Sequence, residues 1–114
     1  MNWETKGKVL LLNGAPVPLA GDVRQVLEHN GALIVVLEYV KGAPLGSRNV
    51  VGVNSSGKCI WQIAALENLA KDPNPVTCVE NRDNKIYLFF WEGVYGLLDT
   101  RDGSYIVPDG QRPW

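Results

Sequence analysis

Cysteine and histidine are scarce in this chain of 114 residues, which holds two cysteines and one histidine. Cys59 and Cys78 stand singly among apolar neighbours, without the C-x-x-C spacing of zinc and redox sites, so we interpret both as reduced core residues. His29 lies in the turn sequence HNG, where we expect a solvated side chain. A single turn imidazole offers no basis for a histidine metal cluster or for a buried base in a catalytic triad.

Charge of one sign and long apolar runs are also lacking. Eleven basic and twelve acidic residues give a net charge of -1 without a basic stripe, so nucleic acid is not an expected partner. No stretch reaches the ~18 apolar residues of a membrane helix. Residues 1–14, MNWETKGKVLLLNG, carry charges where a signal peptide needs an apolar core. These features predict a soluble, cytoplasmic protein with no membrane partner.

The chain does contain many short runs with strand character, separated by turn residues. The expected strands cover residues 9–14, 23–28, 32–40, 49–53, 58–63, 76–80, 85–91, 94–99 and 104–107. Only IAALENLAKD, residues 63–72, has near-helical spacing, and Pro73 ends it. We therefore predict an all-β, antiparallel protein that forms a single domain over residues 1–114.

An internal repeat organises these strands. Residues 26–38 align without a gap with residues 79–91, and residues 50–54 then align with residues 95–99. We predict two four-stranded antiparallel, blade-like meanders, at about 23–63 and 76–107, beside an N-terminal strand and the short helix. The match is one of pattern more than of identity, so chance likeness between two β-meanders remains an alternative.

The two repeats end in similar stretches, GVNSSGKCIW and LLDTRDGSYI. The positions that match are Gly52, Asn54, Gly57, Lys58 and Trp61 in the first unit, and Leu97, Asp99 and Gly103 in the second. This pattern resembles the blade ends of quinoprotein-type (PQQ-like) β-propellers, in which a closing tryptophan recurs. The second unit departs from it with Val107 at the tryptophan position. A closed propeller needs at least about four blades, so the resemblance implies local structure and neither a cofactor nor an activity.

The stretch GVNSSGKC, residues 52–59, also has the glycine and lysine spacing of a phosphate-binding loop. Its last position, Cys59, is a poor magnesium ligand, and the following CIWQI indicates a strand where such a loop needs a helix. We interpret it as a hairpin turn in which Asn54 bonds the following backbone and Gly57 takes a positive φ. Asp99 and Gly103 are expected to act likewise. With Asp83 and Asp102, Asp99 lacks the ligand pattern of a calcium loop, so we expect no metal and no cofactor.

Two strands are apolar on both faces. In KIYLFFW, alternation places Ile86, Leu88 and Phe90 on one face and Lys85, Tyr87, Phe89 and Trp91 on the other. In ALIVVLEYV, alternation separates Leu33, Val35 and Leu37 from Ala32, Ile34 and Val36. A strand buried on both faces needs a layer on each side. The N-terminal strand, the short helix or another subunit must supply the second layer.

We expect a binding function without chemistry. The first hypothesis is a non-catalytic protein-interaction or regulatory module, for instance of the immunity type, in which Tyr87, Phe89, Trp91 and Tyr95 contact another protein or a second copy in a homodimer. In the alternative, these aromatic residues line a cleft for a small apolar or planar ligand.

The acidic residues bear on both hypotheses. Glu38 or Glu92 would lie at the rim of a ligand cleft, and the two could also be imagined as an acid-base pair. We expect these carboxylates to keep solvent contact at strand ends, so no enzyme is predicted. Burial of the aromatic residues in the ordinary core remains the third interpretation.

Overall fold

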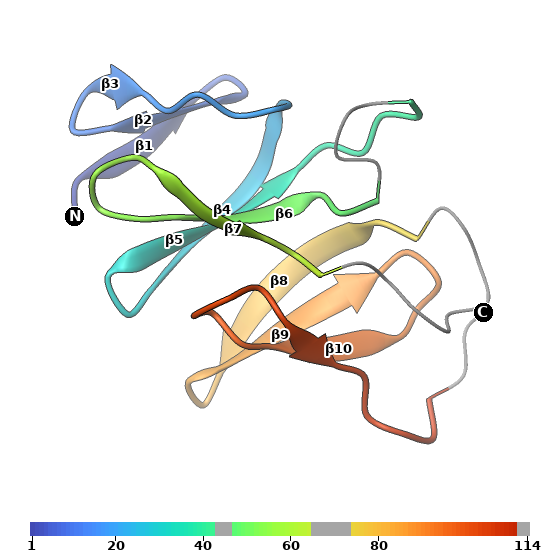
Figure 1. Cartoon of the computed structure of the whole chain (residues 1–114). Helices are drawn as coiled ribbons and strands as arrows, with labels where there is room; N and C mark the ends of the chain where they lie inside the picture. Colours follow the sequence, from blue (N-terminus) through green and yellow to red (C-terminus); the bar gives the residue numbers. More distant parts are fainter. Residues whose placement is uncertain (43–46, 65–73, 112–114) are drawn as a thin grey trace.

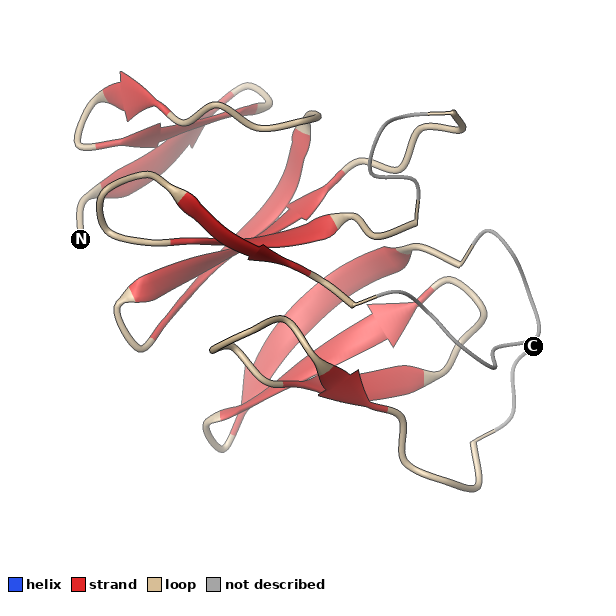
Figure 2. Cartoon of the chain, in the orientation of Figure 1, coloured by secondary structure: helices blue, strands red, loops and turns tan. Residues whose placement is uncertain are grey.

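The computed structural model describes residues 1–42, 47–64 and 74–111, and this part of the chain is all β (Figures 1 and 2). Its strands are β1 (Trp3–Lys6), β2 (Val9–Leu12), β3 (Ala15–Pro16), β4 (Val23–His29), β5 (Ala32–Leu37), β6 (Val50–Val53), β7 (Cys59–Gln62), β8 (Val76–Arg82), β9 (Lys85–Phe90), β10 (Tyr95–Leu98) and β11 (Tyr105–Ile106). They form an N-terminal sheet of β1 to β3, a central sheet of β4 to β7 and a C-terminal sheet of β8 to β11. The predicted all-β class with two four-stranded antiparallel meanders is confirmed.

The N-terminal region and the expected helix differ from prediction. One N-terminal strand was expected, but turns at Gly7 and Gly14, which have φ of 62° and 81°, divide this region into three. The helix expected over residues 63–72 lies almost entirely outside the described residues. Ile63 extends the central sheet instead, because its N–H donates to the Val50 carbonyl at 2.8 Å. Within the described ranges, no helix has the length and apolarity to cross a membrane.

The central sheet lies between the other two sheets (Figure 1). Along β5, Leu33, Val35 and Leu37 pack toward the N-terminal sheet, and Ile34 and Val36 pack toward the C-terminal sheet. Each of the five is at most 2% exposed. The apolar character of β5 on both faces therefore reflects burial in the middle layer, and the N-terminal sheet supplies the layer that the sequence left unassigned.

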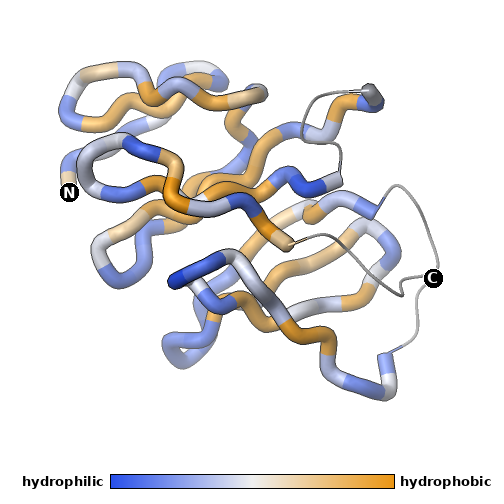
Figure 3. The backbone as a smooth tube through the Cα atoms, viewed as in Figure 1, coloured by the Kyte–Doolittle hydropathy of each residue, from blue (hydrophilic) through white to orange (hydrophobic). Residues whose placement is uncertain are grey.

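Two hydrophobic cores result, one on each side of the central sheet. The first contains Leu10, Leu12, Val17, Val23, Leu33, Val35, Leu37, Val51 and Val53. The second contains Ile34, Val36, Val50, Ile63, Val76, Val79, Ile86, Leu88, Phe90, Val94 and Leu98. Figure 3 shows hydrophobic colour along the strands and hydrophilic colour at most of the turns.

Each meander begins with a β-bulge at the same place. The register of β4 and β5 shifts between Val23 and Gln25, and the register of β8 and β9 shifts between Val76 and Cys78. The extra residues, Arg24 and Thr77, are equivalent in the aligned repeats. They also meet in space, because Arg24 Nε donates to the Thr77 carbonyl at 2.7 Å. Bulges increase local twist, and here they bring the two meanders together.

Side-chain amides close the outer edge of β8. The Gln25 amide accepts from the Val79 N–H at 2.9 Å and donates to its carbonyl at 2.8 Å. The Asn49 amide accepts from the Val76 N–H at 2.9 Å and donates to its carbonyl at 2.9 Å. Since unpaired strand edges invite pairing with other chains, these contacts both join two sheets and protect an edge.

Candidate functional site

The stretch that resembles a phosphate-binding loop is the hairpin turn between β6 and β7, as predicted. Asn54 Oδ1 accepts from the N–H groups of Ser56 and Lys58, at 3.0 Å each, and Gly57 has a φ of 81°. In the second meander, Asp99 Oδ1 accepts from the Arg101 N–H at 3.0 Å and Gly103 has a φ of 80°. Both turns are thus built by one local rule, an Asn or Asp that caps the backbone and a glycine that reverses it.

Trp61 joins the first meander to the last turn of the second. Its Nε1 donates to the Thr100 carbonyl at 2.9 Å. Its indole also covers Gly52, where an added Cβ would lie 2.3 Å from Cε2, and Gly103, where an added Cβ would lie 2.7 Å from Cε3. Close approach of the indole therefore requires glycine at both positions.

The strand register gives Trp61 a different counterpart from the sequence alignment. Gly52 pairs with Trp61, and Leu97 pairs with Ile106, whereas the alignment placed Val107 opposite the tryptophan. The first turn, from Asn54 to Gly57, is one residue shorter than the second, from Asp99 to Gly103. The difference arises because the register of β6 and β7 shifts between Gly52 and Val53, which offsets the missing residue. Ile106 is 67% exposed, since no further meander covers it among the described residues.

Ile106 belongs to a surface that we call the outer face, formed by the C-terminal sheet on the side away from the central sheet. Cross-strand pairs define it: Cys78 and Tyr95 flank Phe89, and Glu80 and Leu97 flank Tyr87. The outer face comprises Cys78, Glu80, Arg82, Tyr87, Phe89, Tyr95, Leu97 and Ile106.

The aromatic rings of the outer face form one cluster. The Tyr87 ring centroid lies 6.3 Å from that of Phe89 and 5.4 Å from that of Tyr95. The Arg82 guanidinium lies 5.2 Å and 5.4 Å from the centroids of Tyr87 and Phe89, and its Nε donates to Glu80 at 2.8 Å. A guanidinium held over two rings adds a cation-π contact to a mainly apolar surface.

Three of the four predicted binding residues, Tyr87, Phe89 and Tyr95, thus lie together, and Trp91 lies apart from them. It follows the end of β9, its N–H donates to the Pro75 carbonyl at 2.9 Å, and its side chain is 63% exposed. The alternation of β9 continues through Trp91, since Phe90 and Glu92 on either side are buried, but Trp91 lies beyond the end of the strand. The sequence prediction missed Ile106 and Leu97, although alternation from Tyr95 pointed to Leu97.

Trp91 lines a separate pocket of about 390 Å³ between the bulged ends of the two meanders. Arg24, Glu38, Tyr39, Pro75, Val76 and Thr77 complete its lining. Glu38 lies within ion-pair distance of Arg24, at 3.5 Å, and of Lys8, at 3.8 Å, so its charge is compensated. The pocket offers an exposed indole and apolar walls. The Glu38 carboxylate at its side has its charge balanced by Arg24 and Lys8.

Glu92 is not at the rim of this pocket, and the expectation that it keeps solvent contact is wrong. The residue is 0% exposed, because the chain after β9 turns inward, and its N–H donates to Asn74 Oδ1 at 3.1 Å. Neither carboxylate oxygen has a hydrogen-bond partner among the described residues. An acid-base pair with the half-exposed Glu38 therefore has no support in the geometry.

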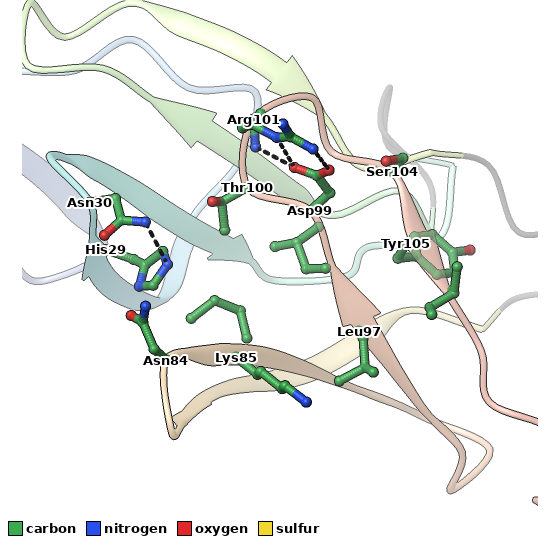
Figure 4. A pocket seen from close by; sticks show the side chains of 13 residues that line it. His29, Asn30, Asn84, Lys85, Leu97, Asp99, Thr100, Arg101, Ser104 and Tyr105 are labelled. Atoms are coloured by element: carbon green, nitrogen blue, oxygen red, sulfur yellow. Dashed lines mark hydrogen bonds and ion pairs between the residues drawn. The ribbon is translucent and has the colours of Figure 1, made fainter.

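A second pocket, of about 640 Å³, lies where turns of both meanders converge (Figure 4). Its lining residues are His29, Asn30, Asn84, Lys85, Ile86, Leu97, Leu98, Asp99, Thr100, Arg101, Ser104, Tyr105 and Ile106. His29 was expected to be solvated, but β4 continues through it and leaves it only 9% exposed. The turn itself consists of Asn30 and Gly31, with φ of 50° and 76°.

The charged groups of the turn pocket are mostly engaged with each other. Arg101 donates to both carboxylate oxygens of Asp99, at 3.0 Å and 2.7 Å, and these bonds lower the pKa of Asp99 to about 2. His29 Nε2 lies 3.1 Å from the Asn30 amide nitrogen. Within the described part of the chain, no three His, Cys, Asp or Glu side chains gather as a metal site.

The two cysteines are free but are not core residues, contrary to expectation. Cys59 is exposed on β7, an edge strand of the central sheet, and Cys78 is half-buried on the outer face. Cys78 lies on the outer face of β8 while its neighbour Val79 is buried. On β7, Cys59 and its neighbour Ile60 are both exposed, at the point where the register with β6 shifts.

The fold and these sites describe a small all-β protein of three stacked antiparallel sheets with an aromatic face on the last sheet. The chain belongs to a family described as a domain of unknown function (DUF7957), whose model matches residues 1–109. The match spans all three sheets, and the family description names no activity. No curated protein and no solved structure matches the chain.

Proposed function

We propose that this protein is a non-catalytic protein-interaction or regulatory module of the cytoplasm, and that it binds its partner through the outer face. One observation carries the proposal. The aligned repeats make Tyr87, Phe89 and Tyr95 the counterparts of Ile34, Val36 and Val50, which the next sheet buries completely. On the C-terminal sheet, the same surface has no covering sheet among the described residues.

The composition of the outer face favours a docking surface over an end surface of the stack that contacts only solvent. Aliphatic residues of the central sheet are replaced by Tyr and Phe, with Arg82 beside them. These residue types are enriched in interface cores, and tyrosine combines a large apolar surface with a polar tip. A surface that served only as the end of the stack would need polar residues here.

The N-terminal sheet shows what such an end looks like in this chain. The residues of β1 and β2 that point away from the core are Glu4, Lys6, Val9 and Leu11, in which charged and apolar side chains alternate across the strands. Terminal layers of stacked proteins commonly carry a polar outer surface. The two ends of the stack therefore differ, and the aromatic end is the one suited to binding.

Site-specific photocrosslinking in cells tests this function. A photoreactive phenylalanine analogue replaces Tyr87 on the outer face, and in the control it replaces Val9, which is 47% exposed on the N-terminal sheet. We expect a discrete crosslinked product from position 87 and none from position 9. Absence of a product at position 87, or equal products at both positions, would contradict the proposal.

The pocket at Trp91 favours a second candidate function, the binding of a small apolar or planar ligand. An indole that is 63% exposed beside Tyr39 and Pro75 can stack on a flat molecule. Such a ligand should quench tryptophan fluorescence in the native protein and should lose this effect in Trp91→Phe. A response that persists in Trp91→Phe, or no response to a varied panel of planar compounds, would count against this candidate.

A further inference from the structure

We infer that the partner of the outer face is a second copy of this chain, packed face to face about a two-fold axis. The inference rests on the proposed function and specifies the partner. It starts from what covers the equivalent surface within the chain. Ile34, Val36 and Val50 of the central sheet are covered by Ile86, Leu88 and Phe90, which belong to the face of another antiparallel sheet. A sheet face with apolar side chains is therefore the matching cover for the outer face.

Two sheet faces of the chain point outward, the outer face and the exposed face of the N-terminal sheet. The face of the N-terminal sheet is not a suitable cover for the outer face. A head-to-tail stack would place the N-terminal sheet of one copy on the outer face of the next. That arrangement would bury Glu4 and Lys6 against Tyr87 and Phe89, which is costly for unpaired charges. Such an arrangement would also propagate from copy to copy and would close only if the rotation between copies completes a ring. Packing of two outer faces against each other buries aromatic side chains on both sides and closes as a dimer.

The charges of the outer face are compatible with self-association. Glu80 and Arg82 lie two residues apart on β8 and form an ion pair with each other at 2.7 Å. The Arg82 guanidinium also lies over the Tyr87 and Phe89 rings, so the outer face carries both signs. A half-turn that runs β8 antiparallel to its copy brings Glu80 of one chain toward the second copy's Arg82 and spares both from like-charge contact. The net charge of -1 adds little long-range repulsion between copies.

Ile106 provides the sharpest test position. Its side chain is 67% exposed at the β11 margin of the outer face, whereas its register counterpart Trp61 is held under the next meander. Because Ile106 is mostly exposed, Ile106→Glu should leave the folded chain intact and place a charge in the proposed interface. Val9→Glu is the matched control, since Val9 is also an exposed strand residue, 47% exposed, on the opposite end of the stack.

The experiment is light scattering after size-exclusion chromatography over a series of protein concentrations, with circular dichroism to confirm folding. The native chain and Val9→Glu should show twice the chain mass of 12.5 kDa, and Ile106→Glu should show the chain mass alone. A native chain that stays monomeric at every concentration would overturn the inference. So would a dimer that Ile106→Glu leaves intact or that Val9→Glu also dissociates.

Failure of this inference is distinguishable from failure of the proposed function. A monomer whose position 87 still crosslinks to a different protein overturns self-association and leaves the outer face as a docking surface. A monomer with no crosslink at position 87 overturns both. A dimer whose position 87 crosslinks to another copy of the chain supports both.

Discussion

At the scale of single residues, Trp61 and Gly52 form a large and small pair that is replaced by two residues of equal size, Ile106 and Leu97, in the second meander. The indole occupies the space above Gly52, and Leu97 and Ile106 hold the corresponding positions in the other sheet. Leucine fits there because no indole covers it. The exchange indicates that tryptophan and glycine depend on each other in the first meander.

This dependence predicts a coupling between the two positions. Gly52→Ala should lower the free energy of unfolding by about 1 to 3 kcal/mol, because the new Cβ collides with the indole. In the Trp61→Ile background, the same substitution should cost clearly less, as measured by urea unfolding in a double-mutant cycle. Gly21→Ala is a control with ordinary contact at 3.9 Å and should have little effect. Equal costs for Gly52→Ala in both backgrounds would refute the coupling.

Asp99 predicts a pH dependence at the same scale. Hydrogen bonds from Arg101 lower the pKa of Asp99 from 3.8 to about 2. The folded chain therefore binds this proton more weakly than the unfolded chain. The ion pair stabilises the fold above pH 3.8, and the stabilisation disappears as the pH falls from 3.8 toward about 2.

An NMR titration of the Asp99 carboxyl carbon measures this effect. We expect a midpoint near pH 2 in the native chain and a rise toward 3.8 in Arg101→Gln. Asp102, whose pKa is lowered chiefly by hydrogen bonds from Ser104, serves as the internal control and should move less in this variant. A native midpoint near 3.8 would show that the Arg101 contact does not form in solution.

At the scale of elements, carboxamide side chains pair with strand backbone at positions where no neighbouring strand does so. Gln25, Asn49 and Gln111 each bond both the N–H and the carbonyl of one residue on a strand, namely Val79, Val76 and Tyr95. An amide can do so because it carries a donor and an acceptor in the same geometry as a peptide group. These contacts continue the ladder where the backbone stops.

Asn49 is the most buried of the three, at 2% exposed, and it also donates to the Leu37 carbonyl at 2.8 Å. Asn49→Ala should lower the free energy of unfolding by about 3 kcal/mol, because buried backbone groups of β8 lose their partner. Gln62→Ala is the control, since Gln62 makes one exposed bond, to the Arg48 carbonyl. Chemical denaturation that finds similar losses for both variants would contradict this account.

The strands and turns could be predicted because they follow local sequence patterns. The positions of the site residues could be predicted only in part, because they depend on contacts between segments far apart in the sequence. Alternation in ALIVVLEYV specified a strand buried on both faces, whereas in KIYLFFW only one face is buried and the expected second layer is not found among the described residues. Asn54, Gly57, Asp99 and Gly103 specified two turns. The bulges at Arg24 and Thr77 have no sequence signature of comparable strength. Trp91 lies beyond the end of β9, opposite Pro75, and the burial of His29 and Glu92 depends on packing that local pattern does not encode.

At the scale of the whole molecule, the central sheet makes the two cores interdependent. Its strand β5 contributes Leu33 and Val35 to one core and Ile34 and Val36 to the other. Loss of packing on either side therefore weakens a strand on which both depend. We expect the three sheets to unfold in one cooperative transition.

Leu10 tests that expectation from the N-terminal sheet. Leu10 is 0% exposed, and Leu10→Ala should lower the free energy of unfolding by about 2 to 5 kcal/mol. The side-chain NMR signals of Tyr87 and Tyr95 on the C-terminal sheet, and far-UV circular dichroism, should report the same shifted midpoint. Val9→Ala changes an exposed neighbour and should have little effect. Separate midpoints for the two probes would mean that the sheets unfold independently.

The pairing of every strand with its neighbour in sequence has a consequence for synthesis. Each sheet is complete once its last strand has left the ribosome, since each described strand pairs only with strands adjacent to it in the chain order of its own sheet. The central sheet, however, emerges with Ile34 and Val36 uncovered until residues 76–106 have been made. The nascent chain thus passes through a stage with a bare apolar sheet face, and this interval is where we expect chaperone contact to concentrate.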